Sequence, residues 1–338
     1  MRTQAEKIKE IVYGLALGES LASPSADHRV ALLAPKRIMR MRTLKEYADN
    51  LLQTTTPTPY THAQPGYLLN PSPSDDSEWF VFTAQALMSS STSIEDSWIT
   101  LSKKRDLIRG RTGTKIALRN LDQGSSPAHS GHDNPHYFDD IASVRAVVAG
   151  ILSKGSVSRA VELATKDARI THSEDGIWCA QAIAALVASL LGGSSKEDAV
   201  AVAMQQFPEG AWSARVIEKA LNVAKGDASA ISRALKLEQE CVDRIYSYGI
   251  SAPETLSLLF AHILNAQSAQ ELVLSTYLHK RNLDALPALA GAVAGLVFNE
   301  SWIPKHFLDA PLLLDGVCIP DLKGTDLGVI STQLANAS

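Results

Sequence analysis

The residue types best suited to chemistry lie in a short acidic motif, where Asp75 and Asp76 sit between the hydroxyl groups of Ser74 and Ser77. An apolar segment begins at residue 79, so the motif has the form of a helix N-terminus, with Ser74 as the cap and the acids complementing the helix dipole. Capping is the commoner explanation. The same oxygens are also hard ligands that bind magnesium and leave coordination positions for substrate oxygens, provided that a second acidic cluster lies nearby in the fold.

A second and weaker cluster precedes the alanine-rich segment 287–297. Asn282 and Asp284 are two residues apart, and at a helix entrance their amide and carboxylate oxygens could turn toward one point. A cap beside a loop asparagine is the commoner arrangement. The adjacent cations Lys280 and Arg281 would oppose a metal ion by repulsion, or would replace it by binding phosphate or carboxylate directly.

A histidine-containing loop offers a competing metal hypothesis. Its three histidines are spaced three and four residues apart at His129, His132 and His136. Imidazoles at this spacing could bind zinc on a helix, but Gly131 and Pro135 argue against a helix there. The favoured interpretation is that these histidines face solvent or a ligand beside Tyr137 and Phe138, whose rings could stack on a base.

His172 and two arginines are further candidates. His172 stands before a long alanine-rich segment, where a buried structural histidine and a proton-transferring site residue are equally good explanations. Arg109 and Arg111 lie in a glycine- and threonine-rich stretch that ends at Thr114 and could hold phosphate. A solvated basic turn is the default interpretation of that stretch.

Helical patterns dominate the elements that must position these residues. The apolar run 177–191 is preceded by Ser173 and two acids and is followed by two glycines, so both of its ends carry helix signals. Ser195 and Asp198 form a variant of the capping box before the next helix. Further helical patterns cover residues 214–224, 228–246, 252–266, 269–277 and 285–298. Because alternating β-branched runs are scarce, the sequence predicts an all-α fold.

Two segments break the helical pattern. Residues 53–73 contain five prolines, and residues 122–139 are rich in glycine, serine, proline and histidine. Both are predicted to be long loops beside the active site, because loops of this length in a compact domain are usually functional or disordered. No stretch has the composition of an interdomain linker, so residues 1–338 are predicted to form a single compact helical bundle.

Bulk composition excludes several classes of function. The 32 basic and 36 acidic side chains are spread evenly, so no basic stripe is available for nucleic acid. Three distant cysteines indicate neither a disulfide framework nor a zinc ribbon, and the charged start lacks a signal-peptide core, so a cytoplasmic location is expected. The longest apolar run, 177–191, is shorter than the roughly 20 residues that span a bilayer, so it is interpreted as a buried helix and no membrane partner is expected.

Several motifs together resemble the ADP-ribosylglycohydrolase family. Residues 14–21 (Gly-Leu-Ala-Leu-Gly-Glu-Ser-Leu) are similar to its opening helix, in which Gly-Asp-Ala-Leu-Gly is usual. Residues 74–77 are similar to its Thr-Asp-Asp-Thr signature, with serine in place of both threonines. Residues 140–145 resemble a segment that ends in Met-Arg, and Thr171-His172 resembles a recurrent Thr-His.

The resemblance continues to the C-terminal part of the chain. Residues 282–285 and the run 289–295 resemble the family's Asp-x-Asp-Thr motif and its Ala-Gly-rich last core helix, and Ile303-Pro304 is similar to its Ile-Pro. The motifs follow the family order from Gly14 to about Phe307. Each motif is weak alone, but this order on a helical chain argues against coincidence.

The resemblance implies a bundle in which one or two Mg²⁺ ions lie in a cleft for ADP-ribose or a smaller ribosyl compound. The implied reaction is metal-dependent hydrolysis of an N- or O-ribosyl bond, on an ADP-ribosylated protein or a small ribosyl compound. The implied metal ligands are Ser74, Asp75, Asp76, Asn282 and Asp284. The implied catalytic residues are Asp75, Asp76, Glu19 and Asp27. The implied substrate-binding residues are Ser130, Gly131, His132, Tyr137, Asp140, His172 and Arg281.

Departures from the family pattern leave alternatives open. Glu19 replaces the aspartate of the opening motif, and the glutamate usual after that motif is missing, with Asp27 beside its position. Lys280 and Arg281 replace a Gly-Gly pair, and Ala285 replaces a threonine, so one ion or none is an alternative to two. The chain could be a non-hydrolytic member that binds ADP-ribose or a nucleotide, or a structural protein. A third alternative is a different reaction in which Lys280 or Arg281 replaces one metal charge.

Overall fold

The protein is predominantly helical in the part that the computed structural model describes, which is residues 2–31, 73–226, 229–242, 250–279 and 281–338. Within these residues there is no β-strand, and extended pairing is confined to two isolated bridges, one of which joins Asp139 to Ser251. The prediction of an all-α fold is therefore confirmed.

The helix bounds follow the patterns of the sequence closely. The helices are α1 (Gln4–Ala31), α3 (Asp75–Met88), α4 (Ile94–Ser102), α5 (Thr112–Asp122), α6 (Ile141–Leu152), α7 (Val157–Ala168), α8 (Glu174–Leu191), α9 (Lys196–Met204), α10 (Trp212–Ala224), α11 (Ala230–Glu240), α12 (Ala252–Asn265), α13 (Ala269–Thr276), α14 (Leu286–Phe298), α15 (Lys305–Leu308) and α16 (Leu327–Ala337). Helices α10 to α14 fall on the five segments predicted as helical. The predicted loop 53–73 lies outside the described residues except for Pro73, whereas the loop after α5 is present and runs to the start of α6.

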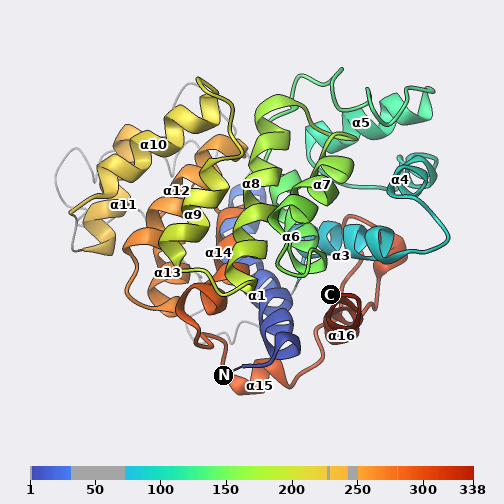
Figure 1. Ribbon diagram of the computed structural model, residues 1–338. Helices are drawn as coiled ribbons and strands as arrows, with labels where there is room; N and C mark the ends of the chain where they lie inside the picture. The colour runs from blue at the N-terminus through green and yellow to red at the C-terminus, as the bar shows by residue number, and fades with distance from the viewer. Residues whose placement is uncertain (1, 32–72, 227–228, 243–249, 280) are drawn as a thin grey trace.

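The core is built around α8, which packs against α6, α7 and α9, and around the pair formed by α1 and α14 (Figure 1). Helices α3, α4 and α5 lie on one side of this core, and α10 and α11 lie on the opposite side. Helix α8 is long and apolar enough to cross a membrane by length and composition, but 78% of it is buried inside the protein, as the sequence interpretation expects.

Close contact between the backbones of α1 and α14 explains the glycines of both segments. A Cβ atom on Gly14 would lie 2.2 Å from the carbonyl oxygen of Gly291, and one on Gly18 would lie 2.1 Å from that of Pro287. No side chain fits at such a distance, so glycine is required where the helices cross. Since residue numbers rise along α1 as they fall along α14, the helices are antiparallel. This arrangement brings Glu19 to the end of the pair where Asp284 precedes α14.

Candidate functional site

Glu19 caps the helix that begins with the acidic motif. The backbone N–H groups of Asp76 and Ser77 donate to its carboxylate at 2.9 and 3.2 Å, and the hydroxyl groups of Ser74 and Ser77 donate to it at 2.5 and 2.6 Å. Ser74 occupies the N-cap position of α3 but makes no side-chain capping bond. The prediction that the Ser74 side chain caps this helix is therefore wrong, because a carboxylate from α1 accepts from the N–H groups of Asp76 and Ser77 instead.

The cap holds Glu19 in a buried position. Burial raises the pKa of Glu19 to about 7, and repulsion from Asp75 adds to the rise, while the hydrogen bonds from Ser74 and Ser77 oppose it. Glu19 is therefore an acid that can gain or lose a proton near neutral pH, in contact with both serines of the motif.

We expect Glu19→Gln to gain stability relative to the unsubstituted protein as the pH rises from about 5 to about 8. Because the pKa of Glu19 in the folded protein lies above its unfolded value of 4.5, its contribution to stability is complete below 4.5 and is lost as the pH rises through about 7. Glutamine does not titrate, so the difference in unfolding free energy should change by on the order of 1–3 kcal/mol over this range. Urea unfolding at each pH measures it, with exposed Glu197→Gln as control. A difference that does not change with pH would contradict the assignment.

A buried arginine lies at the centre of the acidic cluster. Arg111 directly precedes α5, and its Nη2 atom lies 3.1 Å from Oδ1 of Asp76 and 3.5 Å from Oδ2 of Asp284. Its Nη1 atom forms an ion pair with Asp140, which directly precedes α6. The default interpretation of a solvated basic turn is wrong for Arg111, whose side chain is 5% exposed, whereas Arg109 is exposed as expected.

The charged groups around Arg111 shift one another's pKa values. Burial raises the pKa of Asp75, and repulsion from Asp284 adds to the rise. Burial also raises the pKa of Asp76, with repulsion from Asp75 next in size and attraction to Arg111 opposing both. Burial by itself would lower the pKa of Arg111, but Asp284 and Asp76 outweigh it and raise that pKa. Asp284, whose side chain is 35% exposed, and Asp75 are both half-buried, so these two acids open the cluster to solvent, whereas Asp76 and Arg111 are buried.

A second layer of polar residues supports the cluster from within the core. The ring of His172 shares hydrogen bonds with Asp139 at 3.0 Å and with the hydroxyl group of Thr171 at 2.6 Å. Arg145 donates to Thr171 and to Asp167, both at 2.7 Å. Burial would raise the pKa of Asp139, but His172, Arg111 and the backbone N–H of Ile141 together outweigh it and hold that pKa below its usual value. His172 is thus a buried histidine that contacts Asp139, the residue next to Asp140 of the cluster.

Comparison with known proteins places this arrangement in a family. The sequence model of the ADP-ribosylglycohydrolase family matches residues 1–323. The chain belongs to the ADP-ribosylglycohydrolase family. A solved structure described as an ADP-ribosylglycohydrolase-related protein complex covers 100% of both chains with a TM-score of 0.62 and 16% sequence identity, which shows the same fold. A search of curated proteins gives no match. Family and fold support a glycohydrolase-type function.

The residues present do not fit the magnesium site that this family implies. Arg111, a permanent cation, lies within 3.5 Å of both Asp76 and Asp284, where it would repel a metal ion held by the same carboxylates. Asn282 is buried, and its amide group faces Glu254 on α12 at 3.4 Å. Among the described residues, no group of three or more histidine, cysteine, aspartate or glutamate side chains is placed to hold a metal ion.

The other residues that the sequence singles out differ in how far they are buried. Ser130 is buried and donates to the carbonyl oxygen of Ile170 at 2.7 Å, and a Cβ on Gly131 would lie 2.4 Å from the backbone nitrogen of His172. These two residues pack the loop against His172. His132 is exposed, and Tyr137 and Arg281 are half-buried. Asp27 lies on α1, in a part of that helix whose side chains are outside the description. Their assigned roles in binding and catalysis stay predictions.

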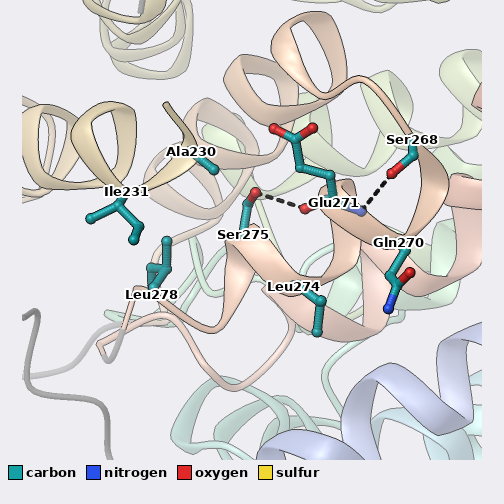
Figure 2. A pocket seen from close by; sticks show the side chains of 8 residues that line it. All are labelled: Ala230, Ile231, Ser268, Gln270, Glu271, Leu274, Ser275 and Leu278. Atoms are coloured by element: carbon teal, nitrogen blue, oxygen red, sulfur yellow. Dashed lines mark hydrogen bonds between the residues drawn. The ribbon is translucent and has the colours of Figure 1, made fainter. Parts of the chain in front are cut away.

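A groove of about 430 Å³ lies away from these acids, between α11 and α13. Figure 2 shows apolar side chains such as Ile231 and Leu278 along it, together with polar ones such as Glu271 and Gln270. None of its lining residues belongs to the acidic cluster around Arg111.

The candidate functional site is the set of Glu19, Asp75, Asp76, Asp140 and Asp284 around Arg111, called the carboxylate cluster below.

Sequence reasoning did not identify the role of Arg111 at the centre of the cluster, and it did not single out Asp139, which lies beside the cluster. Asp139 was not singled out, although its position beside Asp140 at the end of a long loop is a usable signal. Arg111 was noted only for phosphate binding, and nothing in its local sequence separates it from exposed Arg109.

Proposed function

We propose that this protein hydrolyses an N- or O-ribosyl bond of an ADP-ribosyl-type compound, using carboxylates of its own chain. The observation that carries the proposal is the pairing of two half-buried acids, Asp75 and Asp284, whose charges repel each other. Burial and the neighbouring Asp284 raise the pKa of Asp75, which favours its protonated form. The side chain of Asp284 is open to solvent and faces Arg111. A pair of carboxyl groups, one of them favoured in its protonated form, can supply the acid and the base of glycoside cleavage.

The two acids have complementary roles in the proposed reaction. Asp75 donates its proton to the leaving oxygen or nitrogen as the bond to the anomeric carbon breaks. Asp284 takes a proton from the attacking water, whose oxygen bonds to the anomeric carbon, and its negative charge stabilises the positive charge that develops on the sugar. A ribosyl ligand fits the family, which acts on ADP-ribosyl substrates.

We expect Asp75→Asn and Asp284→Asn each to reduce kcat by roughly 10²–10⁴-fold, because each removes a proton-transfer group. Release of free ribose, ADP-ribose or base from an ADP-ribosylated peptide and from smaller ribosyl compounds is measured by chromatography. Asp309→Asn, at an exposed position, is the matched control and should keep full activity. Turnover that survives both substitutions would show that this pair is not the catalytic pair.

Non-hydrolytic binding of ADP-ribose is the second candidate function. It is favoured by the structural use of three acids, since Glu19 caps α3 while Asp76 and Asp140 are held by Arg111. Saturable heat on titration with ADP-ribose, with no product released from any ribosyl compound, would support binding over hydrolysis.

A further inference from the structure

Three carboxylates from distant parts of the sequence meet at one guanidinium group. Asp76 comes from the start of α3, Asp140 from the residue before α6, and Asp284 from the segment before α14, and all three face Arg111. Mutual repulsion would drive three acids apart unless a cation lay between them. The planar guanidinium carries several donors and keeps its charge at every physiological pH.

We propose that the guanidinium group of Arg111 takes the place of a divalent cation at this site, so that the carboxylate cluster is assembled without a metal ion. The sequence hypothesis assigned such a substitution to Lys280 or Arg281, whereas the structure places Arg111 at the centre.

Packing of α5 fixes Arg111 in this position. Gly113, in the first turn of α5, is pressed against the loop before α6, because a Cβ there would lie 2.5 Å from Oδ2 of Asp139 and 2.9 Å from the carbonyl oxygen of His136. Any larger residue would push the start of α5, and Arg111 with it, away from the cluster. The close approach of the backbone at Gly113 thus places the guanidinium group of Arg111 within the carboxylate cluster.

The partners of Arg111 are themselves held. The second carboxylate oxygen of Asp140 accepts a hydrogen bond from the hydroxyl group of Thr255 at 2.7 Å, and the backbone N–H of Asp140 donates to the carbonyl oxygen of Ile250 at 2.9 Å. Asp76 is fixed by its N–H bond to Glu19. An ion could enter only by expelling a buried guanidinium from an ion pair with a fixed acid.

Cation binding tests the proposal without any substrate, so its failure and the failure of the proposed function are separate results. Mn²⁺ is titrated into chelator-treated protein, and free Mn²⁺ is followed by electron paramagnetic resonance. We expect no saturable binding to the unsubstituted protein. Arg111→Ala, which leaves the three acids facing an open space, should bind Mn²⁺ saturably, with an affinity at least about tenfold above the weakest binding that the titration can detect. Arg111→Ala with Asp284→Asn should lose this binding. Arg109→Ala should behave like the unsubstituted protein.

Two results would overturn the proposal. One is stoichiometric Mn²⁺ binding to the unsubstituted protein with an affinity equal to that of Arg111→Ala. The other is a folded Arg111→Ala protein that does not bind Mn²⁺. If Arg111→Ala is unfolded without metal, thermal unfolding with and without Mn²⁺ decides the question. Folding restored by Mn²⁺ supports the replacement, and no restoration contradicts it.

Discussion

Arg111→Met is expected to lower the free energy of unfolding by about 3–5 kcal/mol, because it leaves buried acids without their cation. Asp140 is fully buried and forms an ion pair with Arg111, and Asp76 lies 3.1 Å from it. Methionine fills similar space but supplies neither charge nor hydrogen-bond donors. The loss should be smaller at about pH 5 than at about pH 8, since the abandoned acids can take up protons as the pH falls.

Equilibrium unfolding in urea measures this loss, and Arg109→Met is the matched control. Arg109 is exposed two residues away, so its substitution should change stability by less than about 0.5 kcal/mol. Adding Asp140→Asn to Arg111→Met should recover part of the loss, because the second change removes the stranded charge. If Arg111→Met is as stable as Arg109→Met, the cation does not hold the cluster together.

Local sequence patterns were sufficient to predict the helices but not the contacts between them. Ser195 illustrates the success, since its hydroxyl accepts from the backbone N–H of Asp198 at 3.1 Å, three residues away in the same helix start. Ser74 illustrates the failure. A cap from its own segment was expected, but the cap comes from Glu19, which lies 55 residues earlier on α1.

The same reasoning applies to the candidate site. Its acids could be predicted because they lie in short motifs whose order follows the family. The cation could not, because Arg109 and Arg111 share one stretch, and only the folded structure shows that Arg111 is buried while Arg109 is exposed. Asn282 could not be oriented either, since its amide group faces Glu254 on α12. Long-range packing decides each of these cases.

The crossing of α1 and α14 is the contact on which the position of Glu19 depends, and Gly14→Ala is expected to disrupt it. Alanine is normally better than glycine inside a helix by up to about 1 kcal/mol. Here the added Cβ would lie 2.2 Å from the carbonyl oxygen of Gly291, which belongs to a helix backbone and cannot rotate away. The helices must separate, so we expect a net loss of roughly 1–3 kcal/mol of stability.

Gly192→Ala provides the matched control, because its backbone is right-handed, with φ −70°, and the nearest atom to its Cβ lies 3.2 Å away, a full ångström farther than at Gly14. Separation of α1 from α14 should also weaken the cap on α3, since Glu19 lies one residue beyond the second crossing glycine. Hydrogen exchange at the backbone N–H groups of Asp76 and Ser77 should therefore accelerate in Gly14→Ala and stay unchanged in Gly192→Ala. Faster exchange confined to α1 and α14 would show that the cap forms independently of the crossing, and that Glu19 is held by α3 itself.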